Sequence, residues 1–409
     1  MIRLAKLLKH IQTSNESPSK SPSKGNISLL MGAPGAGKTT ALKELKEEIK
    51  GKDVYGFFCA TTNSAAQELG GVTIHSFLNI PIKEEDRRLS IQKIENSFLS
   101  SFFSQAQSVG FIIIDEAFIL DSYTLDCVYE GLFEANKRLI ARGYNPIQLI
   151  LCGDPAQLLS FKEGRFYKSS IFKEDIPVFE LEGLYRQSNS QYQELWRTAI
   201  NSYRRQGSTQ DIQQWLKKTN CINPYLEYNP SHSCFTIAFT NKQVDEINLR
   251  TLLEYCESNN KPFYEDRKIN LFLAEGAPVV YTSSLKKQGI FKRTRDVINS
   301  ISHIPNKKLL IIKTNKGEFK HVIGGNDVPF KLAYAGTIHM SQGATFDKVQ
   351  VLLSDLMKFT PGAGLVSLTR HSKNLQLVGK NIKGILDILK QGIDKDALAF
   401  LNQPQAIHL

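Results

Sequence analysis

The sequence predicts an α/β protein built from two parallel sheets in tandem, with a small β-rich insertion in the second. Three observations lead to this prediction. Short, nearly continuous apolar segments alternate with helical patterns, and the alternation occurs twice along the 409 residues. Apolar strands of this kind belong to parallel sheets that helices cover on both faces. A stretch of short strands and turns interrupts the second series.

The first series of strands and helices starts near residue 26. Its expected strands are 27–31, 54–59, 111–114 and 147–152. In the helical segment 40–50, apolar residues recur on one face, charged residues cover the other, and Gly51 ends the pattern. We predict a first domain over residues 26–182, with a small insertion at about 79–108.

The second series starts with the apolar segment 234–239. The elements expected after it are the helix 242–255, the strands 334–338 and 348–353, the helix 365–369 and the strand 375–378. Short β-rich segments lie between them at 277–282, 308–314 and 319–323, separated by Lys, Gly and Asn turns. We predict a second domain over 183–270 plus 331–409, with a small β-barrel inserted at 271–330.

The charge balance favours a polyanionic partner. Lys and Arg number 51 against 40 Asp and Glu, a formal net charge of +11, and cationic surfaces attract phosphate backbones. The six cysteines are scattered without a C-x-x-C pair, which predicts no disulfide framework and favours a reducing compartment. No apolar run approaches the ~20 residues of a membrane span. We therefore expect an intracellular protein of the cytoplasm or nucleus, of viral or cellular origin.

The first 25 residues differ from the rest of the chain. Residues 1–12 are basic and bring Leu4, Leu7, Leu8 and Ile11 to one helical face. We interpret them as a surface helix, with a mitochondrial transit peptide as the alternative. Residues 13–25 are a Ser/Pro/Lys tract, typical of a flexible linker.

A phosphate-binding loop follows the first strand. Residues 32–39 read GAPGAGKT, which fits G-x-x-x-x-G-K-[ST] between a strand and a helix. Backbone N–H groups of such a loop surround the phosphates of a nucleotide, and the next helix points its positive end at them. Lys38 is expected to neutralise phosphate charge, and the Thr39 hydroxyl to ligate Mg²⁺. The residues expected to bind ATP here are Gly32, Ala33, Gly35, Ala36, Gly37, Lys38, Thr39 and Thr40.

Two later strand ends complete the expected catalytic site. The strand 111–114 leads into Asp115, expected to hold Mg²⁺, and Glu116, expected to orient water against the γ-phosphate as a general base. A solvated acidic loop is the alternative for this pair. The strand 147–152 leads into a GDPAQ turn, and the amide of Gln157 in that turn is expected to sense the γ-phosphate.

These three motifs, in this order, resemble the first domain of superfamily 1 helicases, and the resemblance continues along most of the chain. The segments that carry it are 58–66 (FCATTNSAA), 73–78 (TIHSFL), 184–187 (LYRQ), 237–244 (IAFTNKQV), 335–346 (AGTIHMSQGATF) and 366–371 (VSLTRH). The segment 73–78 is typical of RecD-like members, and the last motif is similar to that of helicases of positive-strand RNA viruses. The resemblance implies two tandem RecA-like domains.

The resemblance also implies roles for residues of the later motifs. Tyr185 would stack on the nucleotide base, Arg186 would contact phosphate, and Arg370 would reach the γ-phosphate as an arginine finger. Gly343 lies in the motif that couples nucleotide to nucleic acid, and it is expected to help bind ATP. The catalytic set expected in this way is Lys38, Glu116, Gln157, Arg186 and Arg370, with the lysine on one domain and both arginines on the other. A core tyrosine and a structural arginine are the alternatives for Tyr185 and Arg370.

A nucleic-acid track is expected along both domains. Its candidates are Thr61, Thr62, Asn63, His75 and Phe77 in the first domain, and Thr240, Asn241, His339 and Ser341 in the second. Hydroxyls and amides suit phosphate contacts, which position a strand without reading its sequence, and rings offer stacking surfaces for unpaired bases. A turn or helix-cap role is the alternative for each residue.

The expected function is that of a nucleic-acid-stimulated ATPase. It would be a helicase or translocase that moves along single-stranded DNA or RNA and separates duplex at junctions, with 5′-to-3′ polarity if the RecD-like resemblance holds. A monomer is its expected working form, although the sequence leaves the oligomeric state open. The alternative is a helicase-like NTPase that acts mainly in transport, packaging or movement of nucleic acid, with little unwinding.

Overall fold

The computed structural model describes most of the chain. The described residues are 26–50, 55–80, 86–104, 109–158, 164–173, 176–183, 185–186, 190–219, 233–285, 288–325, 328–353, 361–379, 393–402 and 406–408, with Leu7, Cys221 and Leu389. The chain divides into two compact units: residues 1–186, 193–208 and 392–409 form the first, and residues 187–192 and 209–391 form the second. The helix and linker predicted over residues 1–25 lie outside the described residues, apart from the buried Leu7.

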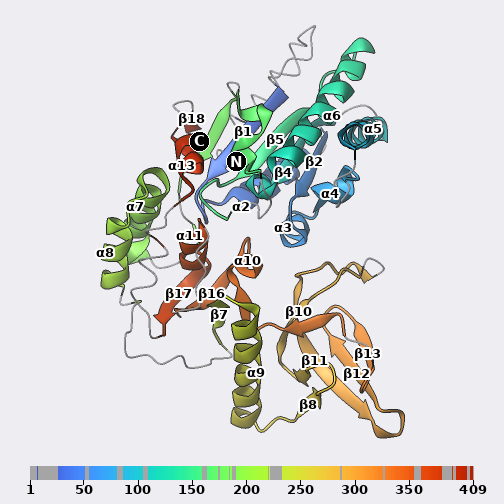
Figure 1. The fold of residues 1–409 in the computed structure, drawn as a ribbon, viewed down its shortest axis with the longest axis vertical. Coiled ribbons are helices and arrows are strands. Elements are labelled where there is room, and N and C mark those ends of the chain that lie inside the picture. Colours follow the sequence, from blue (N-terminus) through green and yellow to red (C-terminus); the bar gives the residue numbers. More distant parts are fainter. Residues whose placement is uncertain are drawn as a thin grey trace. The chain divides into compact units, whose positions relative to one another are not determined.

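A seven-stranded sheet forms the centre of the first unit, and each strand is parallel to its neighbours (Figure 1). Its order is β18-β6-β1-β5-β4-β2-β3. The strands are β1 (Ile27–Gly32), β2 (Tyr55–Ala60), β3 (Val72–Thr73), β4 (Val109–Asp115), β5 (Gln148–Gly153), β6 (Val178–Leu181) and β18 (Ala406–His408). Every residue of β1 and β5 is buried, as expected of a sheet covered on both faces. The four strands predicted for this sheet are confirmed.

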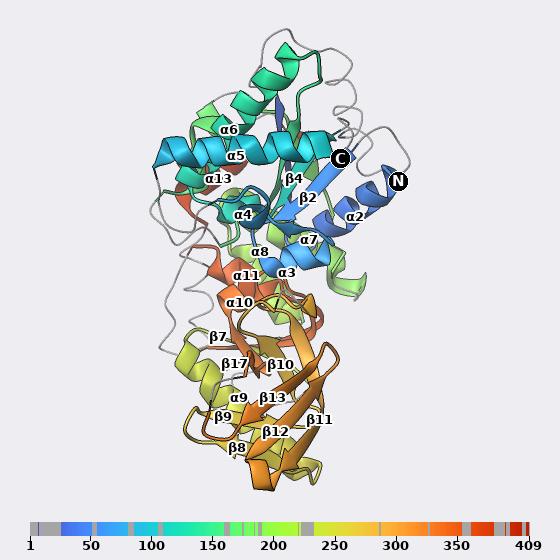
Figure 2. The same ribbon diagram turned by 90° about the vertical axis from the view of Figure 1, so that its right-hand side faces the viewer.

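Helices cover this sheet. They are α2 (Lys38–Glu48), α3 (Asn63–Glu68), α4 (Ile74–Phe77), α5 (Arg87–Ser104), α6 (Ser122–Ala141) and α7 (Ser190–Gln206), with 3-10 turns η2 (Ala117–Ile119), η3 (Phe166–Lys168) and η4 (Ser170–Lys173). The insertion predicted at 79–108 is mostly the helix α5, which packs against α6 (Figure 2). The two helices approach closely because Gly131 has no side chain: a Cβ there would lie 2.5 Å from Cγ2 of Ile94.

The C-terminal residues return to the first unit, which differs from the boundary predicted from the sequence. Residues 392–409 belong to that unit rather than to the second domain. The strand β18 pairs in parallel with β6, and the red end of the chain lies beside this sheet in Figure 1. The helix α13 (Lys395–Leu401) packs Phe400 against Phe166 and Phe172, with ring centroids 5.3 and 4.9 Å apart.

A four-stranded parallel sheet of order β15-β7-β16-β17 organises the second unit. Its strands are β7 (Phe235–Ala238), β15 (Ala335–Thr337), β16 (Phe346–Leu352) and β17 (His371–Val378), accompanied by helices α8 (Gln210–Lys218), α9 (Asn241–Ser258), α10 (Ile338–Ser341) and α11 (Ala363–Leu368). The helix α9 starts where it does because Thr240 and Gln243 form a reciprocal capping box. The second predicted series of strands and helices is confirmed.

The insertion in the second unit is antiparallel and begins at residue 263, before the start predicted at 271. A hairpin joins β8 (Phe263–Asp266) to β9 (Leu271–Ala274), and a five-stranded sheet has the order β13-β12-β11-β10-β14. The strands of that sheet are β10 (Pro278–Tyr281), β11 (Arg295–Ile304), β12 (Leu309–Thr314), β13 (Glu318–Val322) and β14 (Phe330–Leu332), with a 3-10 turn η6 (Pro305–Lys307). In the pairing of the described residues β13 and β14 are the two edges, so a closed barrel is not established.

Candidate nucleotide and nucleic-acid site

The phosphate loop joins β1 to α2 within the first unit. Gly37 has a left-handed backbone with a φ of 83°, which glycine adopts without strain, and α2 begins at the next residue. The free N–H groups and the positive end of α2 therefore face the loop. Nζ of Lys38 donates to the carbonyl oxygens of Gly32 at 2.7 Å and Ala33 at 3.2 Å. This places the ammonium group inside the loop, where phosphate oxygens would meet it.

The remaining residues predicted to bind ATP differ in exposure. Gly32, Ala33 and Ala36 are buried, Gly35 and Thr39 are half-buried, and Thr40 is exposed on the first turn of α2. The loop therefore acts mainly through its backbone, and Thr40 offers a hydroxyl at its rim.

Thr39 and Asp115 bring two oxygen ligands together. The strand β4 ends at the buried Asp115, and Oγ1 of Thr39 donates to its Oδ2 at 3.4 Å. Burial raises the pKa of Asp115, and the positive charge of Lys38 opposes that rise. Among the described residues no cluster of His, Cys, Asp and Glu could hold a metal alone. Two side-chain oxygens fit Mg²⁺, which takes its other ligands from water and phosphate.

Glu116 occupies a strained turn directly after Asp115. Its φ is 55°, uncommon for a residue with a Cβ. Its N–H donates to Oδ1 of Asp115 at 2.9 Å, and its carbonyl oxygen accepts from Oγ1 of Thr61 at 3.1 Å. The N–H of Thr61 donates to the carbonyl oxygen of Asp115 at 3.1 Å. These bonds hold the turn in a conformation of a kind that clusters at functional sites, with the Glu116 side chain half-buried.

Gln157 lies in a buried turn after β5, and an ion pair holds that turn. The N–H of Gln157 donates to the carbonyl oxygen of Asp154 at 3.1 Å. Three bonds join the Arg204 guanidinium of α7 to the Asp154 carboxylate: Nε to Oδ1 at 3.1 Å and Oδ2 at 3.2 Å, and Nη2 to Oδ1 at 3.0 Å. Burial lowers the pKa of Arg204, but the charges and hydrogen bonds of Asp154 and Glu180 outweigh it and leave that pKa raised.

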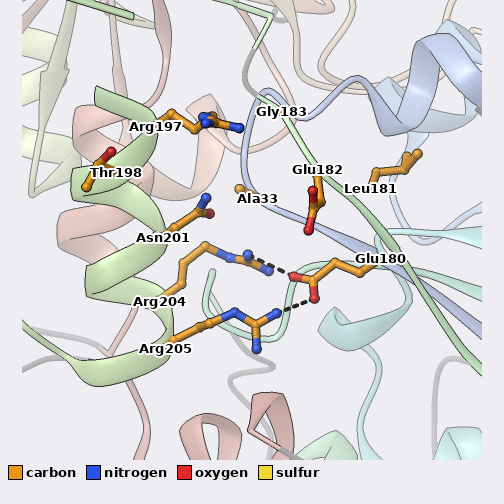
Figure 3. A pocket seen from close by; sticks show the side chains of 10 residues that line it. All are labelled: Ala33, Glu180, Leu181, Glu182, Gly183, Arg197, Thr198, Asn201, Arg204 and Arg205. Carbon is orange, nitrogen blue, oxygen red and sulfur yellow. Dashed lines mark hydrogen bonds and ion pairs between the residues drawn. The ribbon is translucent and has the colours of Figure 1, made fainter. Parts of the chain in front are cut away.

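A pocket of about 220 Å³ borders the phosphate loop. It is lined by Ala33, by residues 180–183 at the end of β6, and by side chains of α7. Figure 3 shows Arg204 and Arg205 reaching from α7 to the carboxylate of Glu180. The same arginine that holds the Gln157 turn therefore also lines the pocket beside the loop.

Arg204 is a functional candidate that the sequence analysis missed. It is separated from Asp154 by 50 residues, so no local motif joins them. One signal was available: Trp196, Ile200 and Arg204 recur at every fourth position of α7, which places the arginine on the buried face of an amphipathic helix. A basic residue on such a face predicts a buried acidic partner.

Tyr185 and Arg186 lie in the first unit, beside the phosphate loop. The N–H of Tyr185 donates to the carbonyl oxygen of Gly35 at 2.8 Å, and its side chain is exposed. Burial lowers the pKa of Arg186, and the negative charges of Glu116 and Glu68 oppose that shift. Arg186 was predicted to belong to the second domain, but the first unit extends to this residue. Arg186 and Lys38 therefore belong to one unit.

Arg370 and Gly343 lie in the second unit. The Arg370 side chain is buried after α11, where its Nε donates to the carbonyl oxygen of Val366 at 3.1 Å and its Nη2 to Oγ1 of Thr369 at 2.9 Å. Gly343 has a φ of 79° in the turn after α10. Backbone and hydroxyl acceptors thus fix the guanidinium against its own helix, and its role as an arginine finger stays a prediction.

The five track candidates of the first unit are all half-buried and lie just after β2 and β3. They are Thr61, Thr62, Asn63, His75 and Phe77. Oγ1 of Thr62 caps α3 by accepting the N–H of Ala65 at 3.2 Å, and the Phe77 ring lies 4.8 Å from that of Phe57. Because the carboxyl ends of parallel strands share one edge of a sheet, these residues and the phosphate loop lie along the same edge, where open α/β sheets bind ligands.

The four track candidates of the second unit differ from one another. Thr240 caps α9 at the end of β7, and the next residue, Asn241, is exposed. His339 is half-buried, and burial together with the positive charge of Arg293 lowers the pKa of its imidazole. Ser341 is fully buried and donates to the carbonyl oxygen of Ile338 at 2.7 Å. Because its hydroxyl is bonded within α10, we leave Ser341 out of the proposed track.

All six cysteines are free thiols, and five of them are buried. None of the helices in the described ranges is long and apolar enough to cross a membrane.

Two family models match the chain, one on each side of residue 230. Residues 21–223 match a model described as an AAA domain, and residues 242–379 match the viral superfamily 1 RNA helicase core domain. The first match contains the phosphate loop with Asp115, Glu116 and Gln157, and the second contains Gly343 and Arg370. The chain belongs to the superfamily 1 helicases.

Several proteins similar to this superfamily 1 helicase are Pif1 helicases. The ATP-dependent DNA helicase Pif1 of Bdellovibrio bacteriovorus is 24% identical over 93% of this chain and 89% of its own length. The crystal structure of Pif1 from Candida albicans superimposes with a TM-score of 0.66 at 20% identity, covering 98% of both chains. The structure of Bacteroides Pif1 bound to ssDNA gives a TM-score of 0.65 at 21% identity, covering 98% of this chain and 96% of that chain. Some curated relatives are longer, and the chain spans 56% of the Danio rerio Pif1 helicase.

Proposed function

We propose that this chain is an ATP-dependent helicase that moves along single-stranded DNA and separates duplex. The observation that carries the proposal is one edge of the first sheet, where Lys38, the Thr39–Asp115 pair and Glu116 lie together. The DNA substrate is supported by the Bacteroides relative, whose structure is bound to ssDNA. The same edge carries the hydroxyls, amide and rings proposed to contact that strand.

Hydrolysis follows from the chemistry of this edge. The loop N–H groups and Lys38 would bind the β- and γ-phosphates, and Thr39 and Asp115 would hold a Mg²⁺ ion, which would supply positive charge to neutralise the phosphate oxygens. Glu116 orients the attacking water and accepts its proton. We assign the sensing of the γ-phosphate to Gln157 and its charge stabilisation to Arg186 of the same unit. Arg370 would act as the finger of the second unit, and Tyr185 would stack on the base.

In the first unit, hydrogen bonds connect the proposed nucleic-acid track directly to the catalytic turn, which offers a way for nucleic acid to stimulate hydrolysis. Thr61 belongs to the proposed track, yet its N–H and hydroxyl bind the backbone of Asp115 and Glu116. A strand gripped at Thr61, Thr62 and Asn63 would therefore set the position of the Glu116 turn. The strand would thus reinforce the bonds that already hold the Glu116 turn, so we expect hydrolysis to be faster with nucleic acid than without it.

Several finer properties rest on the superfamily resemblance. We propose 5′-to-3′ movement, action as a monomer, and a small barrel formed by the β-rich insertion. The track of the second unit would use Thr240, Asn241 and His339, with Gly343 as the flexible turn that couples it to the nucleotide. If DNA is the substrate, the protein acts in a compartment that contains DNA.

The deciding experiment is an unwinding assay with four duplexes, DNA or RNA, each with a 5′ or a 3′ single-stranded tail. We expect ATP-dependent strand separation of the 5′-tailed DNA duplex, and ATPase activity that rises strongly with single-stranded DNA. Lys38→Ala should abolish both activities but retain strand binding. An ATPase rate that is the same with and without nucleic acid would overturn the helicase proposal. Strand binding without separation of any duplex would favour the transport or packaging alternative.

A further inference from the structure

In the turn that carries Gln157, the acidic residue Asp154 accepts hydrogen bonds from two backbone N–H groups. The carboxylate of Asp154 accepts the N–H of Ala156 at 3.2 Å, and the carbonyl oxygen of Asp154 accepts the N–H of Gln157 at 3.1 Å. The conformation of Asp154 therefore determines the backbone position of Gln157, from which its side chain extends. Asp154 is 3% exposed, so protein groups rather than solvent determine its orientation.

Arg204 determines that orientation. Its guanidinium makes three bonds of 3.0 to 3.2 Å with the Asp154 carboxylate, and its Nη1 lies 3.4 Å from Oε1 of Glu180. The Arg204 side chain is 2% exposed. A planar guanidinium that binds a carboxylate through two nitrogens fixes direction as well as distance, which the point charge of a lysine does not.

The other end of this network reaches the phosphate loop. Glu180 belongs to β6, which pairs with β1, the strand that leads into the loop. Arg205 also contacts Glu180, so both arginines tie α7 to β6 (Figure 3). The network thus joins the Gln157 turn, α7 and the strand beside β1 within one unit.

From this arrangement we propose that Arg204 is a positioning residue for ATP hydrolysis: by holding Asp154, it fixes the Gln157 amide where it senses the γ-phosphate. The inference rests on the proposed function, because it takes Gln157 as the γ-phosphate sensor. Arg204 itself touches neither nucleotide nor water in this role. Its effect passes through the turn, and its loss should therefore lower kcat more than it changes KM for ATP.

The test uses the full chain with ATP, Mg²⁺ and single-stranded DNA, and four variants. Arg204→Lys keeps the charge but loses the bidentate geometry, and Asp154→Asn keeps an acceptor for the Ala156 N–H but loses the charge. Gln157→Ala removes the sensor, and Arg204→Lys/Gln157→Ala completes a double-mutant cycle. Arg204→Ala is avoided because it would leave two buried carboxylates without their partner and threaten folding.

Misplacement of a catalytic group by a fraction of an ångström to 1 Å costs up to about 100-fold. We expect Arg204→Lys and Asp154→Asn to lower the DNA-stimulated kcat by about 10-fold or more, with KM for ATP within about 2-fold. Gln157→Ala should lower kcat by about 100-fold. The double variant should be no slower than Gln157→Ala, because both changes act on one group.

The control is Glu194→Gln, an exposed change on the same helix. Arg197 pairs with Glu194 on the surface at 2.6 Å, and such pairs contribute little to stability. The kcat of this variant should equal that of the parent. Thermal unfolding of every variant establishes that the first unit is folded at the assay temperature.

Three outcomes overturn the proposal, and the third also overturns the sensor assignment of the proposed function. A folded Arg204→Lys variant with parental kcat shows that the ion pair is only structural. A double variant whose loss equals the product of the single losses shows that Arg204 does not act through Gln157. If Gln157→Ala itself retains parental kcat, the sensor assignment of the proposed function fails, and the positioning role fails with it.

Discussion

The hydroxyl oxygen of Thr39 lies 3.4 Å from Oδ2 of Asp115, so one hydrogen bond joins the phosphate loop to the end of β4. Asp115→Asn keeps the shape of the side chain but removes the charge that a metal ligand supplies. We expect kcat for ATP hydrolysis to fall by about 100-fold or more and the Mg²⁺ concentration at half-saturation to rise. An ATPase titration with Mg²⁺ measures both quantities. Lys43→Met, an exposed change on α2, should leave both unchanged.

Glu116→Gln tests the general base separately from nucleotide binding. Bonds to its backbone hold Glu116 in a left-handed turn, and the residue is half-buried, so the amide fits the same space. We expect kcat to fall by about 10²–10⁴-fold, as for removal of a general base, with ATP affinity near that of the parent. Single-turnover hydrolysis and equilibrium nucleotide binding separate the two effects. Equal losses in binding and hydrolysis would contradict the assignment.

Much of the first sheet was predictable because its central strands are buried on both faces. The segment 111–114 reads as a strand for that reason, and it is part of β4. The strands β3 and β18 have two and three residues, too few for a periodic pattern, and they lie at the edges of the sheet. Their positions depend on tertiary pairing. For this reason the second domain was predicted to extend from residue 331 to the C-terminus, whereas residues 392–409 return to the first unit.

The candidate site was also predictable from the sequence only in part. The phosphate loop was predictable because its glycines and Lys38 are contiguous and act largely through the backbone. The Arg204–Asp154 pair joins residues 50 positions apart and has no fixed spacing. Ser341 fits a helicase motif, but the burial that directs its hydroxyl to Ile338 is visible only in three dimensions.

Phe400→Ala should destabilise the first unit although it lies far from the phosphate loop in sequence. The buried ring of Phe400 contacts those of Phe166 and Phe172, and its centroid is 6.1 Å from that of Phe118, two residues after Glu116. Truncation of a buried phenylalanine costs about 3–5 kcal/mol, which corresponds to a fall of about 10 °C in Tm for a unit of this size. Thermal unfolding measures this fall.

The matched control for Phe400 is Leu253→Ala, which removes an exposed apolar side chain of α9. It should change Tm by only a small amount. A Phe400→Ala variant with the Tm of the control would show that the C-terminal helix does not stabilise the first unit. Retained Tm with lower ATPase activity would contradict the packing argument as well.

The last prediction concerns acid stability of the insertion. Asp266 is buried, and its Oδ2 accepts the N–H of Gly324 at 2.6 Å and lies 3.0 Å from Nε2 of His321. The Gly324 bond, followed by that of His321, lowers the pKa of Asp266 below its ordinary value. A lowered pKa in the folded state adds stability above the unfolded pKa of about 3.9, and that stability is lost as pH falls through the folded value.

Asp266→Asn should therefore lower the thermal stability of the insertion at neutral pH, and the difference from the parent should shrink as pH falls below about 4. Thermal unfolding of both proteins at a series of pH values measures the difference. Glu257→Gln, an exposed change on α9, should follow the parent at every pH. A difference that stays constant down to the acid limit would show that the carboxylate charge contributes nothing, and that the Gly324 and His321 contacts act only through their geometry.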